Sequence, residues 1–200
     1  MPDSLILIRS GATAYDLQGR IRGSLDIPLS GEGVEEAGRV AAATAALRPV
    51  ALYVSESGCA VETGRIVGAA CGLAPRRVAN LRNLDQGLWQ GLLVDDIRRK
   101  QPRLYRQWQD NPWAVSPPEG ELLDEACERV ATALERICRR HAAGRVALVV
   151  PQPLDRIVWW LLAGESMGDL WARDPRPEPI DLVPVAEQWR TASRRQPQQA

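Results

Sequence analysis

The sequence has no surplus of either charge. Lys+Arg and Asp+Glu residues both number 25, so the formal net charge at pH 7 is zero, and the sequence pI is near 6.6. Proteins that bind nucleic acids or anionic membranes usually carry a basic surplus. We therefore expect no nucleic-acid partner and no membrane partner, and look instead for a small molecule or another protein.

Long apolar runs are also missing. The longest, residues 157–163, is well below the roughly 18 residues of a membrane span. The apolar run near the N-terminus, residues 5–8, is too short for the core of a signal peptide and has no basic leader. The sequence thus predicts a cytoplasmic protein.

Cysteine pairs and histidine clusters are absent from the sequence. Its four cysteines are dispersed, without a CxxC pair: Cys59, Cys71, Cys127 and Cys138. Dispersed cysteines of a cytoplasmic protein are usually reduced and structural, so we expect no disulfide, no metal and no cofactor. The single histidine, His141, is expected at the C-terminal end of a helix, as a cation that interacts with the helix dipole.

No linker rich in glycine, serine or proline divides the 200 residues. We predict one domain over residues 1–190 and a polar, frayed tail over residues 191–200. A chain of this size buries about 70% of the surface that its unfolded form exposes, which is enough for a core without disulfides or metal ions.

Short apolar runs alternate with amphipathic stretches along the chain. The runs cover residues 5–8, 50–54 and 146–150. Continuous apolar runs of this length are typical of strands in a parallel sheet that is covered on both faces. The alternation predicts an α/β fold with a mostly parallel central sheet.

The stretches between these runs show helical periodicity over residues 33–47, 60–71 and 122–141. We expect these helices to cover the sheet. Residues 85–101 and 110–121 are rich in glycine, proline and charge, and are expected to form loops and short helices near the mouth of the sheet.

The residues after the first apolar run form a spaced pattern. It reads Arg9-Ser10-Gly11-Ala12-Thr13 and continues with Asp16, Arg20, Arg22, Gly23, Asp26, Pro28, Leu29 and Gly33. This string resembles the opening of the histidine phosphatase superfamily: Arg-His-Gly-x-Thr, then Asn, Arg, Gln-Gly, x-x-Asp-x-Pro-Leu and a glycine that begins a helix. Ser10 stands at the histidine, and Arg22 stands where the family often has glutamine.

Three further segments continue the resemblance, and each departs from it at one position. Cys59 stands at the arginine of Ser-x-Leu-x-Arg-Ala-x-x-Thr-Ala. Asn83 stands at the glutamate of Leu-x-Glu-x-Asp-x-Gly-x-Trp-Glu-Gly. Gln152 stands at the second histidine, where the family has Ser-His-Gly-Gly and this chain has Pro-Gln-Pro-Leu. Residues 117–121 also resemble a Pro-Gly-Gly-Glu segment of some members.

The resemblance covers residue 5 to the helix expected after residue 154. It implies a three-layer α/β/α sandwich of the phosphoglycerate-mutase-like type, with a pocket at the carboxyl ends of the strands. The family's reaction, as the resemblance implies it, uses an imidazole to attack phosphorus. Arginines and the second histidine hold the phosphoryl oxygens, and a carboxylic acid protonates the leaving oxygen.

Each replacement removes a property that this reaction needs. Ser10 is not a nucleophile at neutral pH without an adjacent base. Asn83 cannot donate a proton as an acid does, Gln152 stays neutral, and Cys59 lacks the bidentate fork of arginine. We therefore expect no intact catalytic residue. The four positions should nevertheless converge on one cleft.

An anion can still bind where the chemistry is absent, because arginines bind phosphate or carboxylate without any reaction. The residues expected to line such a site are Arg9, Ser10, Asp16, Arg22, Gly23, Asn83 and Gln152. The expected ligand is phosphate or another small anion. Two alternatives remain open: Arg9 forms a salt bridge with Glu56 or Asp85, or Arg22 points into solvent.

These observations favour a catalytically inactive protein that acts as a ligand-binding or protein-interaction regulatory module. One alternative is a weak phosphatase with a rearranged site, in which Cys59 is a reactive thiol at a helix start. Another is a scaffold or assembly subunit with a vestigial pocket. A protein partner or a homodimer fits the pair Trp159 and Trp160, which cannot both be buried against one layer.

Overall fold

One five-stranded sheet organises the molecule. The structure, a computed structural model, describes residue 2 and residues 4–164, 167–171 and 180–185. The strand order is β3-β2-β4-β1-β5, and only the β1–β5 pair is antiparallel. The strands are β1 (Ser4–Arg9), β2 (Ala51–Ser55), β3 (Pro75–Val78), β4 (Arg145–Val150) and β5 (Ile180–Pro184). The predicted mostly parallel α/β sheet is confirmed.

The central strands are apolar without interruption because both of their faces are covered. In β1, Leu5 and Leu7 contact the core on one side of the sheet, whereas Ile6 and Ile8 contact the core on the other. All four side chains are buried. Since neighbouring side chains of a strand point to opposite faces, each face receives every second residue.

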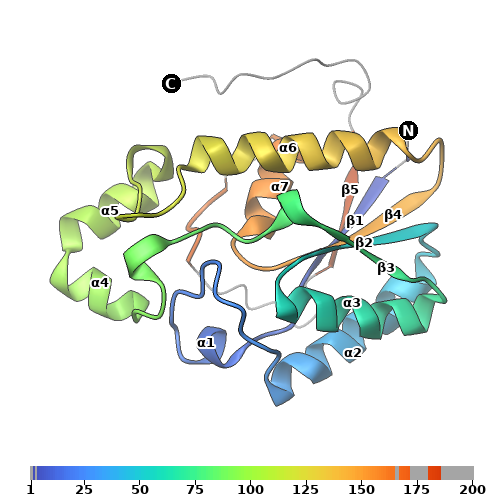
Figure 1. Ribbon diagram of the computed structural model, residues 1–200, viewed down its shortest axis with the longest axis horizontal. Helices are drawn as coiled ribbons and strands as arrows, with labels where there is room; N and C mark the ends of the chain where they lie inside the picture. Colours follow the sequence, from blue (N-terminus) through green and yellow to red (C-terminus); the bar gives the residue numbers. More distant parts are fainter. Residues whose placement is uncertain (1, 3, 165–166, 172–179, 186–200) are drawn as a thin grey trace.

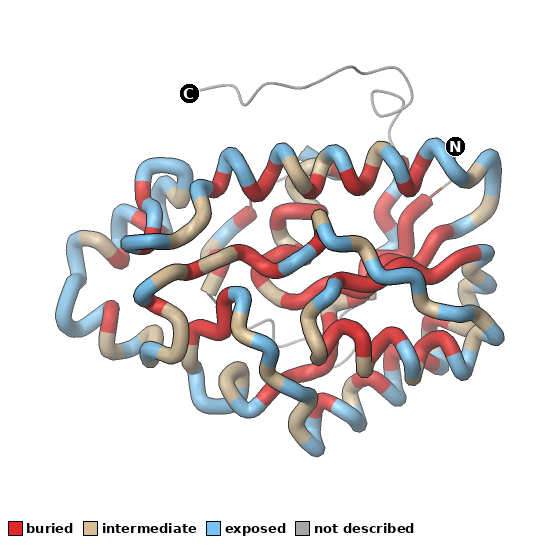
Figure 2. Tube along the Cα trace, in the orientation of Figure 1, coloured by how far each residue is buried: buried red, intermediate tan, exposed pale blue. Residues whose placement is uncertain are grey.

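Helices cover the two faces as separate layers (Figure 1). α2 (Gly31–Ala46) and α3 (Gly58–Cys71) lie against one face, and α6 (Leu123–Arg139) and α7 (Leu154–Ala163) lie against the other. Figure 2 shows buried and exposed residues alternating along α6, as expected for a helix with one face on a core. The predicted three-layer sandwich is confirmed.

The remaining elements are short. They are α1 (Ala14–Leu17), α4 (Val94–Lys100), α5 (Pro102–Asp110) and 3-10 helices at Ala79–Leu81, Gly87–Trp89 and Pro112–Ala114. α4 and α5 lie beyond one end of the sheet, to the left in Figure 1. The stretches expected as loops and short helices fall among these elements. The tail predicted over residues 191–200 lies outside the described residues.

The loop after β1 approaches the start of α2 closely. A Cβ atom on Gly11 would lie 2.1 Å from the carbonyl oxygen of Gly33, and one on Gly33 would lie 2.0 Å from the carbonyl oxygen of Ala12. Ser30, the N-cap of α2, donates its hydroxyl to the same Ala12 oxygen at 3.0 Å. The main chain of this loop is therefore held against α2 by a contact that only glycine permits at both positions.

Several tryptophans pack against the core, and the exposed Trp113 lies edge-on to Trp160 with ring centroids 5.0 Å apart. Trp159 and Trp160 are both half-buried and pack against the core. Trp171 stacks on Trp108 with ring centroids 4.8 Å apart and lies edge-on to Trp89. Within the described part of the chain, no helix is long and apolar enough to span a membrane.

Candidate functional site

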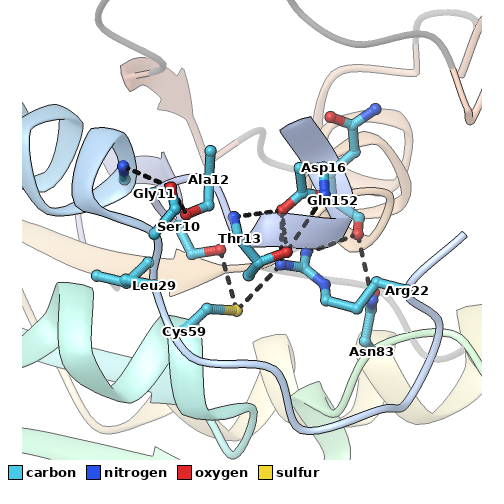
Figure 3. Close-up of polar contacts among 12 residues, drawn as sticks. Ser10, Gly11, Ala12, Thr13, Asp16, Arg22, Leu29, Cys59, Asn83 and Gln152 are labelled. Atoms are coloured by element: carbon cyan, nitrogen blue, oxygen red, sulfur yellow. Dashed lines mark hydrogen bonds and ion pairs between the residues drawn. The ribbon is translucent and has the colours of Figure 1, made fainter. Parts of the chain in front are cut away.

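Four segments bring the site together at the carboxyl ends of the parallel strands. Ser10 directly follows β1, and Gln152 comes two residues after β4. Cys59 lies in the first turn of α3, which follows β2, and Asn83 lies beyond β3. The structure thus brings these four positions together at the carboxyl ends of the strands, as the family resemblance implies, although the segments are far apart in sequence (Figure 3).

Arg22 joins the four positions. Its Nη1 atom lies 3.3 Å from the Sγ atom of Cys59, which also accepts the hydroxyl of Ser10 at 3.5 Å. Its Nη2 atom donates to the main-chain oxygen of Gln152 at 3.1 Å. The side-chain amide of Asn83 donates to this same oxygen, also at 3.1 Å. One guanidinium therefore occupies the middle of the cluster.

The charge of Arg22 is balanced locally. Arg22 is 5% exposed, so the alternative in which it points into solvent is wrong. Its Nη1 atom pairs with Oδ2 of Asp16 at 3.1 Å. That carboxylate is itself held by the N–H and the hydroxyl of Thr13, both at 2.7 Å. A buried guanidinium requires such a partner because desolvation of an unpaired charge is costly.

The sequence did not indicate which atoms of Asn83 and Gln152 would make the contacts in this cluster. Both N–H groups of the Asn83 amide go to carbonyl oxygens, that of Gly23 at 2.7 Å and that of Gln152 at 3.1 Å. No N–H of this amide remains for an anion, contrary to the expectation from sequence. Gln152 presents its main-chain oxygen, and its side-chain amide points away from Cys59 and Asn83 (Figure 3).

A small cleft opens beside this cluster. It holds about 290 Å³ of empty space, counted together with the solvent at its open mouth, and is lined by Arg9, Ser10, Ala12, Asp16, Arg22, Glu36 and Gln152. Glu36 was not singled out in the sequence; it lies on α2, three residues after Gly33, and accepts the N–H of Ala12 at 2.8 Å. Two arginines and two carboxylates line the cleft, so its formal charges cancel.

A buried ion pair supports the segment that carries Asn83. Arg129 of α6 donates to both carboxylate oxygens of Glu121, at 2.6 and 2.7 Å. It also donates to the carbonyl oxygens of Asn80, Arg82 and Asn83 at 3.0, 2.7 and 3.3 Å. Both side chains are less than a tenth exposed. Arg129 therefore ties the end of the Asn83 segment to α6.

The single histidine of the sequence lies at the other end of the sheet, where the parallel strands begin. His141 follows α6 and precedes β4, and its Nε2 atom is 3.0 Å from the hydroxyl of Tyr53. Burial, followed by the charges of Arg76 and Arg140, lowers the pKa of His141 below its usual value. His141 thus lies just beyond the C-terminal end of α6 as expected, but its lowered pKa favours the neutral imidazole over the expected cation.

The cysteines are all free thiols. Burial raises the pKa of Cys127 to about 12 and that of Cys138 to about 11, which makes both thiols inert. Cys59 is buried as well, with 1% of its surface exposed.

No group of three or more His, Cys, Asp or Glu residues within the described part of the chain could hold a metal ion.

Known proteins with similar sequences include phosphate-ester enzymes. Phosphoglycerate mutase-like protein 4 of Arabidopsis thaliana is 32% identical over 148 residues, which cover 72% of this chain and 64% of the relative. This chain thus spans less than two thirds of the length of that protein. Phosphoserine phosphatase 1 of Hydrogenobacter thermophilus is 27% identical over 168 residues, which cover 84% of this chain and 80% of the relative.

Solved structures agree with the fold. The mycobacterial glucosyl-3-phosphoglycerate phosphatase in complex with VO3 superposes with a TM-score of 0.78 at 22% identity, covering 92% of this chain and 99% of that one. Its complex with inorganic phosphate gives 0.73 at 23% identity, with 86% and 84% covered. Residues 5–183 match the family model of the histidine phosphatase superfamily, branch 1. The chain belongs to that superfamily.

Proposed function

We propose that this chain is a non-catalytic member of the superfamily that binds a small anion in the cleft beside Arg9 and Arg22. The observation that carries the proposal is the set of side chains gathered by Arg22. Ser10, Cys59, Asn83 and Gln152 meet there, and none of them supplies an imidazole, a carboxylic acid or a guanidinium.

The imidazole nucleophile of the family's phosphoryl transfer is missing from this arrangement. The hydroxyl of Ser10 donates to a thiol and has no adjacent base. His141, the single imidazole of the sequence, contacts Tyr53 at the edge where the strands begin. Loss of a general acid alone lowers a rate by roughly 10² to 10⁴-fold, and here the acid and the nucleophile are both replaced.

Anion binding keeps a physical basis. Arg9 ends β1 and lines the cleft with Arg22, so two guanidinium groups remain at the site. Asp16 and Glu36 line it too, and an anion must compete with these carboxylates. We therefore expect weak to moderate affinity that falls with added salt. The phosphate and VO3 complexes of the mycobacterial phosphatase are consistent with a small anion as the ligand.

Thermal unfolding with inorganic phosphate tests this proposal. A ligand that binds only the folded state raises the midpoint by mass action, by an amount that corresponds to about 2.7 kcal/mol at one hundred times the Kd. Arg9→Ala should abolish the shift. Arg39→Ala, an exposed arginine of α2, serves as the matched control and should leave it unchanged. No shift with phosphate in the parent protein would instead favour a vestigial pocket.

The rival reading is a phosphomonoester hydrolase with a rearranged site. Relatives named as phosphatases support this alternative, and a measurement of phosphate-ester hydrolysis separates the two functions.

A cytoplasmic location is part of our proposal and is supported by the four free thiols. A protein partner or a homodimer would appear as a concentration-dependent mass in sedimentation.

A further inference from the structure

A second pocket adjoins the anion cleft. It holds about 370 Å³ of empty space, counted together with the solvent at its open mouth, and shares Asp16, Arg22 and Gln152 with the first cleft as lining residues. Five of its other lining residues are apolar: Ile21, Val94, Pro153, Leu170 and Trp171. Arg20 lines it too, and its guanidinium donates to Gln18 and to the carbonyl oxygen of Gly91. A molecule with its charged end at Arg9 can therefore extend its uncharged part into this pocket.

Gln86 lines this pocket with a side chain that is 1% exposed. Neither its Nε2 nor its Oε1 atom has a hydrogen-bond partner among the described residues. Buried polar groups are almost always paired, because an unpaired one loses its contacts with water without compensation. Trp171 and Arg22 line the same pocket, and each has a buried nitrogen without a hydrogen-bond partner, Nε1 of Trp171 and Nε of Arg22.

We propose that Gln86 recognises the hydroxyl groups of a phosphorylated polyol. The side-chain amide offers one donor group and one acceptor without charge, and a hydroxyl group is also donor and acceptor at once. A charged group would gain no ion pair from the Gln86 amide, so the unpaired donor and acceptor of this side chain match a hydroxyl group best. This inference rests on the proposed anion site, which would hold the phosphate end of the same molecule.

Gln86 falls at an unspecified position between Asp85 and Gly87 of the family pattern. Its amide is thus a property of this chain and not of the pattern. A side chain that is unpaired in the ligand-free protein and paired in the complex costs stability and contributes affinity. Replacing Gln86 should therefore change stability and binding in opposite directions, which a purely structural residue would not do.

Binding is measured by titration calorimetry with glycerol 3-phosphate and with propyl phosphate, which has the same chain length but no hydroxyl groups. The parent protein should bind glycerol 3-phosphate at least about tenfold more tightly, because roughly two hydrogen bonds are lost with propyl phosphate. Gln86→Leu should bind the two esters equally. Inorganic phosphate should bind the parent and Gln86→Leu alike, which separates failure of this inference from failure of the anion site.

Thermal unfolding without ligand is the second readout. Gln86→Leu should raise the midpoint by about 2–4 °C, since an unpaired buried amide is removed. Gln107→Leu, an exposed position on α5, is the control and should leave both readouts unchanged. Equal affinities of the two esters for the parent protein, no binding of either ester, or a lower midpoint in Gln86→Leu would each overturn the inference.

Discussion

The guanidinium of Arg22 lies against the thiol of Cys59, with 3.3 Å between Nη1 and Sγ. Position 22 carries arginine where the family pattern often has glutamine, and position 59 carries cysteine where the pattern has arginine. A guanidinium is thus present next to position 59, but it comes from the segment between α1 and α2 instead of from α3. Asp16 balances its charge there.

This relationship predicts strong coupling between positions 22 and 59. Cys59→Arg alone forces a second guanidinium into a buried space, and we expect a cost of about 3–5 kcal/mol in the free energy of unfolding. Arg22→Gln alone removes the ion pair of Asp16 and one of the two donors to the Gln152 oxygen, and should cost about 1–3 kcal/mol. The double variant should be more stable than the sum of both costs by at least about 1 kcal/mol.

Urea unfolding of the four proteins in the cycle measures this coupling. The control pairs Cys59→Arg with Arg39→Gln on the exposed face of α2, where the costs should add. Additive costs at positions 22 and 59 would show that the two side chains do not share one space.

Hydrolysis of p-nitrophenyl phosphate by the purified protein should not exceed the rate of a matched blank. Ser10→His alone should stay at the blank rate, because catalytic groups that act together are strongly non-additive. A set that restores the chemistry must include Arg22→Gln besides Ser10→His, Cys59→Arg, Asn83→Glu and Gln152→His, since Arg22 occupies the space at Cys59. Robust turnover by the parent that disappears in Ser10→Ala would disprove the non-catalytic reading.

Stability should fall as the pH is lowered below about 6.5. The pKa of His141 lies below its usual value in the folded protein, so the unfolded chain binds a proton first. Stability is therefore full above pH 6.5 and is lost as the pH falls toward the folded pKa, by at most about 1.4 kcal/mol per pH unit.

Urea unfolding between pH 5 and pH 7 measures this loss. His141→Gln keeps a possible acceptor for the Tyr53 hydroxyl but does not titrate, so its stability should be flatter over this window. The same slope in both proteins would assign the pH dependence to other groups.

Arg129→Met should destabilise the protein by up to about 3–5 kcal/mol, because it leaves the buried carboxylate of Glu121 with only the half-exposed Arg82 as an ion-pair partner. It also removes the donors to the Asn80 and Arg82 carbonyls. Arg139→Met is the matched control on the same helix. Arg139 pairs with Glu135 at the surface, and its loss should cost less than about 1 kcal/mol. Similar costs in chemical denaturation would show that the buried pair does not clamp this segment.

The strands and helices of the interior were predictable because the buried positions of an element repeat regularly, and its apolar residues therefore repeat in the sequence. β1, β2 and β4 were predicted by continuous apolar runs. β3 was missed because it is a short edge strand with Arg76 and Arg77 exposed. α5 was missed as well, since only Tyr105 and Trp108 are buried on an otherwise polar helix. Edge elements contribute few buried side chains, so their sequences carry a weaker pattern.

The sequence predicted which residues gather at the candidate site but not which atoms they contact there. Spacing placed Ser10, Cys59 and Asn83 at one edge of the sheet, because parallel strands end there together. The partners of Asn83, the pairing of Arg22 with Asp16, and the buried amide of Gln86 depend on side-chain directions and packing across segments. No local pattern in a single sequence encodes these.

The glycine contact between the β1 loop and α2 separates the shape of the site from its chemistry. Gly11 and Gly33 hold the loop through main-chain atoms, so the path of the chain does not depend on which side chain stands at position 10. A different reactive group introduced at Ser10 would be presented from the same backbone position, beside a thiol and a guanidinium that are already in place. That makes this cleft a ready host for a designed catalyst whose reaction is unrelated to phosphate.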